Sequence, residues 1–211
     1  MRILNPQLQR DLEQGSPIKL HLGAGKTHRE GHYSVDLVEL SGVDVVADLN
    51  APLDLLPDHS VSAIYTRHTL EHIANFMGLM SELNRICRPD AEIEIIVPHF
   101  SNPYFYSDPT HVRPFGLYTM HYFMDEAKQP GRKVPAFYTS TRFILKSTRI
   151  DFYRTSLLDR MVVPILRTLV NMNFATQEIY ERRFCWVWPA WQIQYKLRAL
   201  HATKTPSYNS A

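Results

Sequence analysis

Apolar residues recur along the chain mostly in short runs, several of which alternate with polar residues. Such runs, bounded by glycine, proline or polar turns, predict strands. The predicted strands are 18–22, 33–37, 43–47, 61–66, 91–97, 141–152 and 191–200. Because helical or short polar segments separate most of them, the pattern predicts an α/β fold built on a Rossmann-like, mostly parallel sheet.

Helical spacing is clearest between residues 69 and 87, where apolar side chains recur at three- and four-residue intervals. The turn Arg88-Pro89-Asp90 ends this predicted helix. Pro164 predicts a kink in a later apolar helix. The other predicted helices are 117–128, 157–172 and 178–187.

Composition indicates one folded domain. The chain has 211 residues, of which 45% are apolar and 21% are charged, a globular balance that excludes disorder over most of the length. The two cysteines cannot form a disulfide framework, and no stretch of about 18 apolar residues is present. We therefore expect a cytoplasmic protein with an N-terminal extension (1–17), a single domain (18–201) and a flexible tail (202–211).

Charge is distributed unevenly. Residues 1–126 carry a net charge of −8 and residues 127–211 a net charge of +10. This asymmetry indicates an anionic partner for the basic half, such as a phosphorylated small molecule, a lipid surface or a nucleic acid. The alternative is that acidic and basic elements simply pack side by side. Because the basic residues are scattered among apolar ones, we expect no nucleic-acid partner.

A glycine turn follows the first predicted strand. Gly23-Ala24-Gly25 allows a ligand to approach the backbone closely, and Asp36 ends the next strand, where a carboxylate can accept both hydroxyls of a ribose. A dinucleotide site would need a third glycine, but His28 stands there, and the connection to Tyr33 is too short for a full crossover helix. The pattern favours a nucleoside without a pyrophosphate, or else a tight turn with no ligand.

Aromatic residues and prolines fill the segment after the fifth strand. We interpret residues 98–140 as a lid or acceptor-binding region, with Tyr104 and Tyr106 as walls of the acceptor pocket. The alternative is a loop whose aromatic side chains pack back on the core.

Several motifs, in this order, resemble the small class I S-adenosylmethionine-dependent methyltransferases, and most closely their type 11 group. The resemblance spans about residues 19–200. The motifs are Leu22-Gly23-Ala24-Gly25, Val35-Asp36-Leu37, Ala47-Asp48-Leu49-Asn50, His68-Thr69-Leu70-Glu71-His72-Ile73, Arg88-Pro89, Asp108-Pro109-Thr110-His111-Val112-Arg113 and Tyr180-Glu181-Arg182-Arg183. The resemblance implies a seven-stranded sheet, here with a shortened first crossover and with helical and aromatic insertions over the carboxyl ends of the strands.

The same resemblance implies S-adenosylmethionine as cofactor and assigns residues to it. Gly23, Ala24 and Gly25 would line its methionine part, Asp36 would hold the ribose, Asp48 and Leu49 would lie against the adenine, and Arg67 and His68 would border cofactor and acceptor. One departure is His21, which stands where the family commonly has an acidic residue that helps to hold the cofactor's amino group.

Methyl transfer to a hydroxyl needs a group that removes the acceptor's proton, and histidine suits this role near neutral pH. We predict His111 as this base, then His99, with Asp108 orienting His111 or acting as base itself. The alternative for each histidine is a capping or surface role. His68 and His72, four residues apart, could share a helix face and bind a metal with His99, His111 or Asp108, but such spacing is common by chance, and we expect no metal.

These observations predict an enzyme of biosynthesis that methylates a hydroxyl or amine of a small, anionic acceptor, such as a sugar or secondary metabolite. One alternative is a rearrangement or cyclisation on the same scaffold, with or without the cofactor. Another is a non-catalytic module that contacts a membrane surface or a partner through residues 157–167 and the aromatic residues of 184–191. We favour a helix packed on the sheet over this membrane contact.

Overall fold

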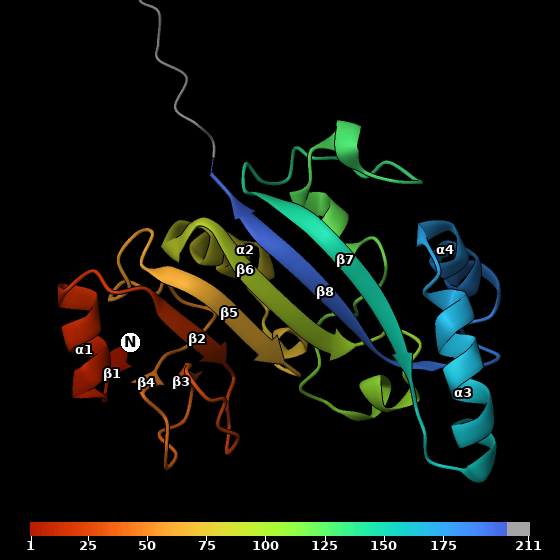
Figure 1. Ribbon diagram of the computed structural model, residues 1–211, viewed down its shortest axis with the longest axis horizontal. Helices are drawn as coiled ribbons and strands as arrows, with labels where there is room; N and C mark the ends of the chain where they lie inside the picture. Colours follow the sequence, from red (N-terminus) through yellow and green to blue (C-terminus); the bar gives the residue numbers. More distant parts are fainter. Residues whose placement is uncertain (202–211) are drawn as a thin grey trace, which may run out of the picture.

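The computed structural model describes residues 1–201, which form one mixed sheet flanked by helices (Figure 1). Its strands are β1 (Arg2–Ile3), β2 (Ile18–Leu22), β3 (Tyr33–Asp36), β4 (Val45–Val46), β5 (Val61–Arg67), β6 (Cys87–Pro98), β7 (Arg142–Phe152) and β8 (Ala190–Leu200). The strand order is β1-β4-β3-β2-β5-β6-β8-β7. Strands β2 to β6 pair in parallel, whereas β1 and β8 are antiparallel to their neighbours. The predicted α/β fold with a mostly parallel sheet is confirmed.

The helices differ in position and length from those that the sequence pattern predicted, and α1 was not predicted. The α-helices are α1 (Pro6–Glu13), α2 (Phe76–Ile86), α3 (Leu157–Val170) and α4 (Phe174–Arg183). The 3-10 helices are η1 (Leu70–His72), η2 (Pro103–Ser107), η3 (Thr119–Phe123) and η4 (Glu126–Lys128). The helix predicted over 69–87 begins only at Phe76, and η1 replaces its first turn. The helix predicted over 117–128 is two 3-10 turns, and Pro164 does not divide α3.

One face of the sheet holds the core. Alternate side chains of β2, β5 and β6, such as Leu20, Ile64 and Ile93, are at most 2% exposed and pack towards α2, which lies behind the sheet in Figure 1. Between β2 and β3 the structure has no helix, as the shortened first crossover predicted.

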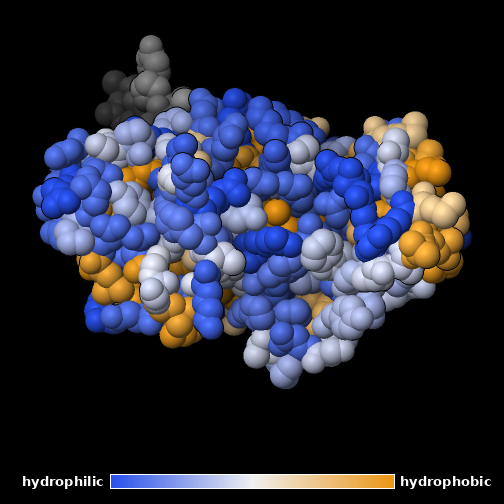
Figure 2. All heavy atoms as spheres, turned by 60° about the horizontal axis from the view of Figure 1, so that its bottom comes forward, coloured by the Kyte–Doolittle hydropathy of each residue, from blue (hydrophilic) through white to orange (hydrophobic). Residues whose placement is uncertain are grey.

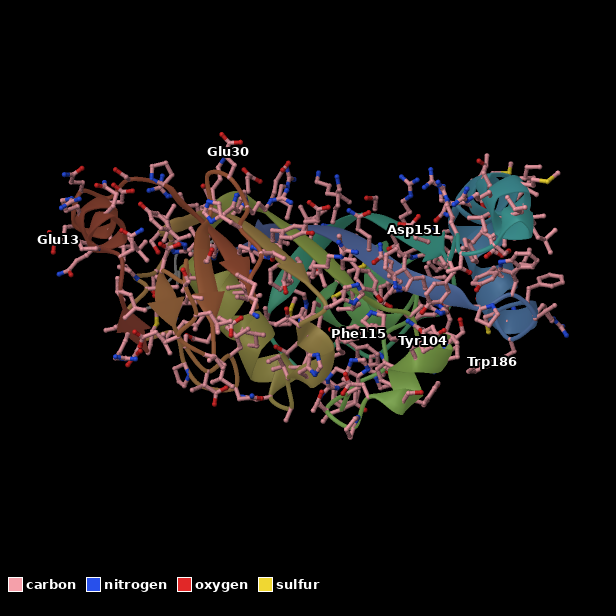
Figure 3. The ribbon with its side chains drawn as sticks, turned by 90° about the horizontal axis from the view of Figure 1, so that it is seen from below. Glu13, Glu30, Tyr104, Phe115, Asp151 and Trp186 are labelled. Atoms are coloured by element: carbon pink, nitrogen blue, oxygen red, sulfur yellow. The ribbon has the colours of Figure 1, made fainter. Side chains whose placement is uncertain are left out.

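The opposite face of the sheet is polar. Lys19, Glu94 and Lys196 line a shallow hollow there with Tyr65, over whose ring the guanidinium of Arg29 lies at 3.9 Å. Parallel sheets are normally covered on both faces, and polar side chains allow this one to remain open. Figure 3 shows Glu30 on this side of the sheet and Phe115 and Tyr104 on the other.

Residues 1–17 complete the sheet edge. β1 pairs with β4, and Leu8 of α1 is fully buried, so this predicted extension packs as part of the domain. The predicted tail, 202–211, lies outside the described residues. The predicted lid region, 98–140, has two kinds of aromatic side chain: Phe115 packs in the core, whereas Tyr104 is 68% exposed. Over residues 1–201, no helix combines the length and the apolar character needed to cross a bilayer.

Candidate cofactor and acceptor site

Two adjoining cavities lie at the carboxyl ends of the parallel strands. β2 is flanked by β3 and β5, so the strand order reverses at β2, and ligands of open α/β sheets bind at such a switch point. The first cavity, about 260 Å³, is lined by Gly23, Asp36, Leu37, Ala47, Asp48, Leu49, Asn50, His68, Thr69, His72 and Ile73. The second, about 410 Å³, is lined by His68, Glu71, His72, Pro98, Asn102, Tyr104, Phe105, Asp108, His111, Tyr153 and Trp191. His68 and His72 form the wall that the two cavities share.

Gly23 is the point of closest approach between the first turn and the next strand ends. Its φ is +64°, and its N–H donates to the Val35 carbonyl at 2.8 Å. A Cβ at this position would lie 2.1 Å from Thr69 Oγ1. Only glycine therefore combines this backbone conformation with the approach of Thr69, and Thr69 in turn lines the cavity.

Asp36 ties the glycine turn to the end of β3. Its Oδ2 accepts the N–H of Gly25 at 2.8 Å and its Oδ1 accepts the N–H of Val38 at 3.0 Å. An ionised carboxylate has about four lone-pair positions, so Asp36 retains two for a ligand. The carboxylate lines the cavity, and no atom lies within 4 Å of the place where a Cβ of Gly25 would stand. This geometry fits a ribose whose two hydroxyls face Asp36.

Part of the first cavity is lined by apolar side chains that suit an adenine ring. Leu37 is 65% exposed, and the buried side chains of Leu49 and Ile73 also line the cavity. Asp48 Oδ1 accepts two hydrogen bonds from Asn50. Its other oxygen remains available to a ligand amino group.

Of the two residues predicted to border cofactor and acceptor, only His68 lines the cavities. Arg67 lines neither cavity, and its guanidinium lies 5.6 Å from the ring centroid of Trp191. His68 lines both cavities and has a φ of +51°, an uncommon backbone conformation for a residue with a side chain. Such strain concentrates at functional sites.

A tether brings His111 to the second cavity. The backbone N–H groups of Val112 and Arg113 donate to the carbonyl of Glu71 at 2.8 and 3.3 Å. His111 Nε2 then lies 3.9 Å from Glu71 Oε1. Glu71 is 1% exposed, and within residues 1–201 its Oε2 has no hydrogen-bond partner. A buried carboxylate with a free oxygen therefore faces the predicted base.

The hydrogen bonds of His111 define which nitrogen can accept a proton. Nδ1 lies 3.0 Å from the Phe105 carbonyl, which can only accept, so the proton of the neutral ring is on Nδ1. Nε2 is then the free acceptor, and it lies 3.6 Å from Asp108 Oδ2. Two carboxylates, of Glu71 and Asp108, thus flank the nitrogen that would take up a proton.

Asp108 is better suited to stabilise a charged histidine than to act as a base. Hydrogen bonds from the Thr110 side chain and backbone, followed by the nearby His111 and His72, hold the pKa of Asp108 below its ordinary value. A carboxylate with a lowered pKa is a weak proton acceptor. The Thr110 hydroxyl donates to Asp108 at 2.6 Å, so it accepts from His72 Nδ1 at 2.9 Å.

His99, the second predicted base, does not line the second cavity. It is 0% exposed, and its Nδ1 accepts the N–H of Ser101 at 3.1 Å, so the proton on Nε2 points to Glu181 Oε1, also at 3.1 Å. Both nitrogens are therefore occupied in joining the end of β6 to α4, and we do not retain His99 as a base.

Of the two tyrosines predicted as walls of the acceptor pocket, only Tyr104 lines the second cavity. Tyr104 lines the second cavity and packs edge-on against Tyr153. Tyr106 does not line it, because its hydroxyl donates to the Phe100 carbonyl at 2.8 Å and its ring remains 63% exposed.

Sequence reasoning missed three side chains of the second cavity. The sequence analysis names Glu71 only as part of the His68–Ile73 motif and assigns it no role, although its place in that motif was a usable signal. Tyr153 and Trp191 stack on each other with centroids 5.8 Å apart. They come from the end of β7 and from β8, and nothing local in the sequence connects them to the motif.

Glu71, His72 and His111 each place one potential ligand atom within 4.8 Å of the others. These residues could hold a metal ion; the expectation of no metal remains a prediction. His21, the departure from the family pattern, does not line the first cavity. Its ring packs edge-on against Tyr65, and burial, followed by the charge of Arg29, lowers its pKa.

Comparison with known proteins supports the fold. No protein family profile matches the sequence, and no curated protein matches it significantly. Among solved structures, a SAM-dependent methyltransferase from Archaeoglobus fulgidus is similar, with a TM-score of 0.54 and 17% identity over 92% of this chain and 91% of that one.

Two further structures are similar. The YcgJ protein from Bacillus subtilis has a TM-score of 0.53 and 15% identity over 93% of this chain and 99% of its own. A protein from Bacillus halodurans assigned as a methyltransferase has a TM-score of 0.51 and 15% identity over 93% of this chain and 100% of its own. The chain therefore has the class I methyltransferase fold, as predicted.

Proposed function

We propose that this protein transfers the methyl group of S-adenosylmethionine to a hydroxyl or amine of a small acceptor. The observation that carries the proposal is the juxtaposition of the two cavities. One holds the free side of the Asp36 carboxylate above the glycine turn, the other holds His111, and His68 is common to both. A nucleoside cofactor in the first cavity and an acceptor in the second would meet at His68.

The cofactor, when bound, supplies an electrophilic methyl group on a sulfonium. Asp36 would hold its ribose, and the exposed Leu37 with the buried Leu49 would enclose the adenine beside Asp48. The methionine part would lie against Gly23, which has no side chain to clash with it. Because Asp36 is already fixed by Gly25 and Val38, its orientation costs little on binding.

The protein's own contribution to the reaction is positioning and proton removal. The acceptor oxygen or nitrogen would form its bond to the methyl carbon as the bond from that carbon to sulfur breaks, and its proton would pass to Nε2 of His111. The carboxylates of Glu71 and Asp108 would stabilise the resulting imidazolium. The Phe105 carbonyl keeps the ring in the orientation that this step needs.

Charges around the second cavity favour an acceptor whose reactive end is not anionic and whose other end is anionic. Glu71 and Asp108 beside the reactive position suit a hydroxyl or amine and disfavour an anionic group there. A neighbouring cavity of about 250 Å³ shares Trp191 and adds Arg154 and Arg167. We propose that an anionic part of the acceptor, a sugar or secondary metabolite, lies at these arginines.

Isothermal titration with S-adenosylmethionine and, separately, S-adenosylhomocysteine tests the proposal. Binding of both at micromolar concentrations would support it and justify a screen of anionic hydroxyl- and amine-bearing acceptors. No heat at millimolar ligand would overturn it and would leave a cofactor-free rearrangement or cyclisation as the leading alternative.

A second measurement tests the metal expectation. Elemental analysis of the purified protein should find no stoichiometric metal, and methyl transfer should survive chelation. Loss of activity on chelation, restored by a divalent ion, would assign Glu71, His72 and His111 as metal ligands instead of a proton-accepting group.

A further inference from the structure

The outer face of α3 is unusually apolar for a solvent-exposed helix. Leu157, Met161, Ile165 and Leu169 follow one another at four-residue spacing, and each is more than half exposed. Leu158 and Met172 extend the same face. We call these six side chains the α3 patch. Figure 2 shows hydrophobic surface at the right end of the molecule, where Figure 1 places α3 and α4.

Packing within the domain does not account for this patch. α3 contacts β7 through its other side, where Val163 is fully buried and Val170 is 5% exposed. The helix therefore has one apolar side that packs on the core and a second apolar side that is exposed to solvent. Contiguous apolar surface of this kind marks a contact with a partner or a membrane.

Arginines flank the α3 patch. Arg160 and Arg167, seven residues apart, lie on one flank of α3, and Arg154 precedes the helix. Within residues 1–201, Arg154 and Arg160 form no ion pair, whereas Arg167 lies 3.7 Å from Asp151. Asp159, the acidic residue of α3, accepts the backbone N–H groups of Thr155 and Ser156 in the capping box at the start of the helix. The patch thus combines apolar side chains with uncompensated positive charge.

We propose that the α3 patch docks on the surface of an anionic lipid bilayer. An interfacial helix buries its apolar side chains at the boundary of headgroups and acyl chains, and flanking arginines bind the anionic headgroups. The net charge of +10 over residues 127–211 would add long-range attraction to such a surface.

A second copy of this chain fits the same patch less well. In a two-fold interface the same patch meets itself, so the arginines of both copies would be brought together. Like charges would then oppose the contact, and the neighbouring acidic side chains are already engaged: Asp159 in the cap and Glu178 with Tyr118. An anionic bilayer supplies the counter-charge that a second copy lacks.

Vesicle flotation of the full chain tests the proposal without reference to methyl transfer. The chain should float with vesicles of phosphatidylcholine and phosphatidylglycerol and stay in solution with phosphatidylcholine alone. The double variant Met161→Asp/Ile165→Asp should lower binding by at least about tenfold. Both side chains are exposed, so its thermal unfolding should match the wild type.

A matched variant controls for a general effect of added negative charge. Phe137 is 79% exposed and lies outside the α3 patch, so Phe137→Asp should leave flotation unchanged. Arg160→Glu, which changes an arginine outside the proposed acceptor site, should weaken binding to the anionic vesicles, more at low salt than at high salt.

Three results would overturn the proposal. They are no flotation with anionic vesicles, equal flotation of the Met161→Asp/Ile165→Asp variant, and equal binding to neutral vesicles. Sedimentation that shows a dimer lost in the same double variant, without vesicle binding, would assign the patch to a second copy. Cofactor titration is a separate measurement, so failure here and failure of the proposed methyl transfer are distinguishable.

Discussion

The two halves of the cleft are built differently. The proposed cofactor half is lined by residues at and after the carboxyl ends of β2, β3, β4 and β5. Its proposed anchor, Asp36, is fixed by two backbone N–H groups. The acceptor half consists of side chains from a loop, from the ends of β5 and β7 and from β8, brought together by a tether between Glu71 and the backbone after His111. Loops vary more between related proteins than the elements that they connect. We therefore expect the acceptor half to be the part that differs most between proteins of this fold.

Asp36→Ala is expected to have the largest effect on the cofactor half. The carboxylate would contribute charge-assisted hydrogen bonds to the ribose, so its removal should weaken S-adenosylmethionine binding by about a hundredfold or more. Isothermal titration measures this, with Glu39→Ala as control because Glu39 is an exposed carboxylate paired with Arg2. Near wild-type affinity would refute the assignment.

His111→Ala should impair the acceptor half and leave the cofactor half intact. We expect turnover to fall by about a hundredfold, the range of general-base catalysis, while cofactor affinity stays constant. The control is His28→Ala, since His28 is exposed and lines neither cavity. Single-turnover kinetics measures the rate of methyl transfer, and isothermal titration measures the cofactor affinity. An unchanged rate would reassign proton removal, first to Glu71.

Paired glycine variants test the backbone of the cofactor half. Gly23→Ala combines a positive φ with a clash against Thr69 and should lower the free energy of unfolding by about 3 kcal/mol. Gly25→Ala meets no atom within 4 Å, so only the positive φ opposes it, at about 1 kcal/mol. Urea unfolding compares the two. Equal losses would mean that Thr69 moves aside.

Acid should destabilise the packing of η3 against α4 through His121. This residue is 0% exposed, and burial, followed by the charge of Lys133, lowers its pKa to about 4. As the pH falls below the ordinary value of about 6.5, the unfolded chain binds the proton first, so stability is full above that pH and is lost towards pH 4.

The free energy of unfolding is expected to fall by about 2 kcal/mol between pH 7 and pH 5 as His121 of the unfolded chain takes up its proton. The variant His121→Phe should remove this part of the pH dependence, because phenylalanine keeps the stacking on Phe174 and has no proton to gain. Urea unfolding at the two pH values measures the difference. An unchanged slope in the variant would show that other groups titrate.

Prediction from sequence was most accurate where spacing along the chain determines geometry. The strand predicted over 18–22 coincides with β2, and Asp36 and Gly23 line the cavity predicted for them. Each of these residues lies a fixed number of positions from a strand end, and the parallel register brings those ends together.

Prediction failed where a side chain's surroundings come from distant segments. His99 follows β6 as expected, but Glu181 of α4 and Ser101 enclose it, so it faces the interior. For residues 157–172 the sequence favours a helix packed on the sheet, and α3 does contact β7. Only the structure shows that a second apolar side of this helix stays exposed.

By itself, the sequence determined the mostly parallel sheet, the short first crossover and the nucleoside-type turn, because hydrophobic periodicity and local backbone requirements are properties of neighbouring residues. Only the tertiary structure decided that Glu71 faces His111, that His99 is enclosed, and that the α3 patch is exposed. These depend on which surfaces meet when segments far apart in the sequence pack together, as His99 and Glu181 do across 82 residues. Hydrophobic periodicity carries no information about such contacts.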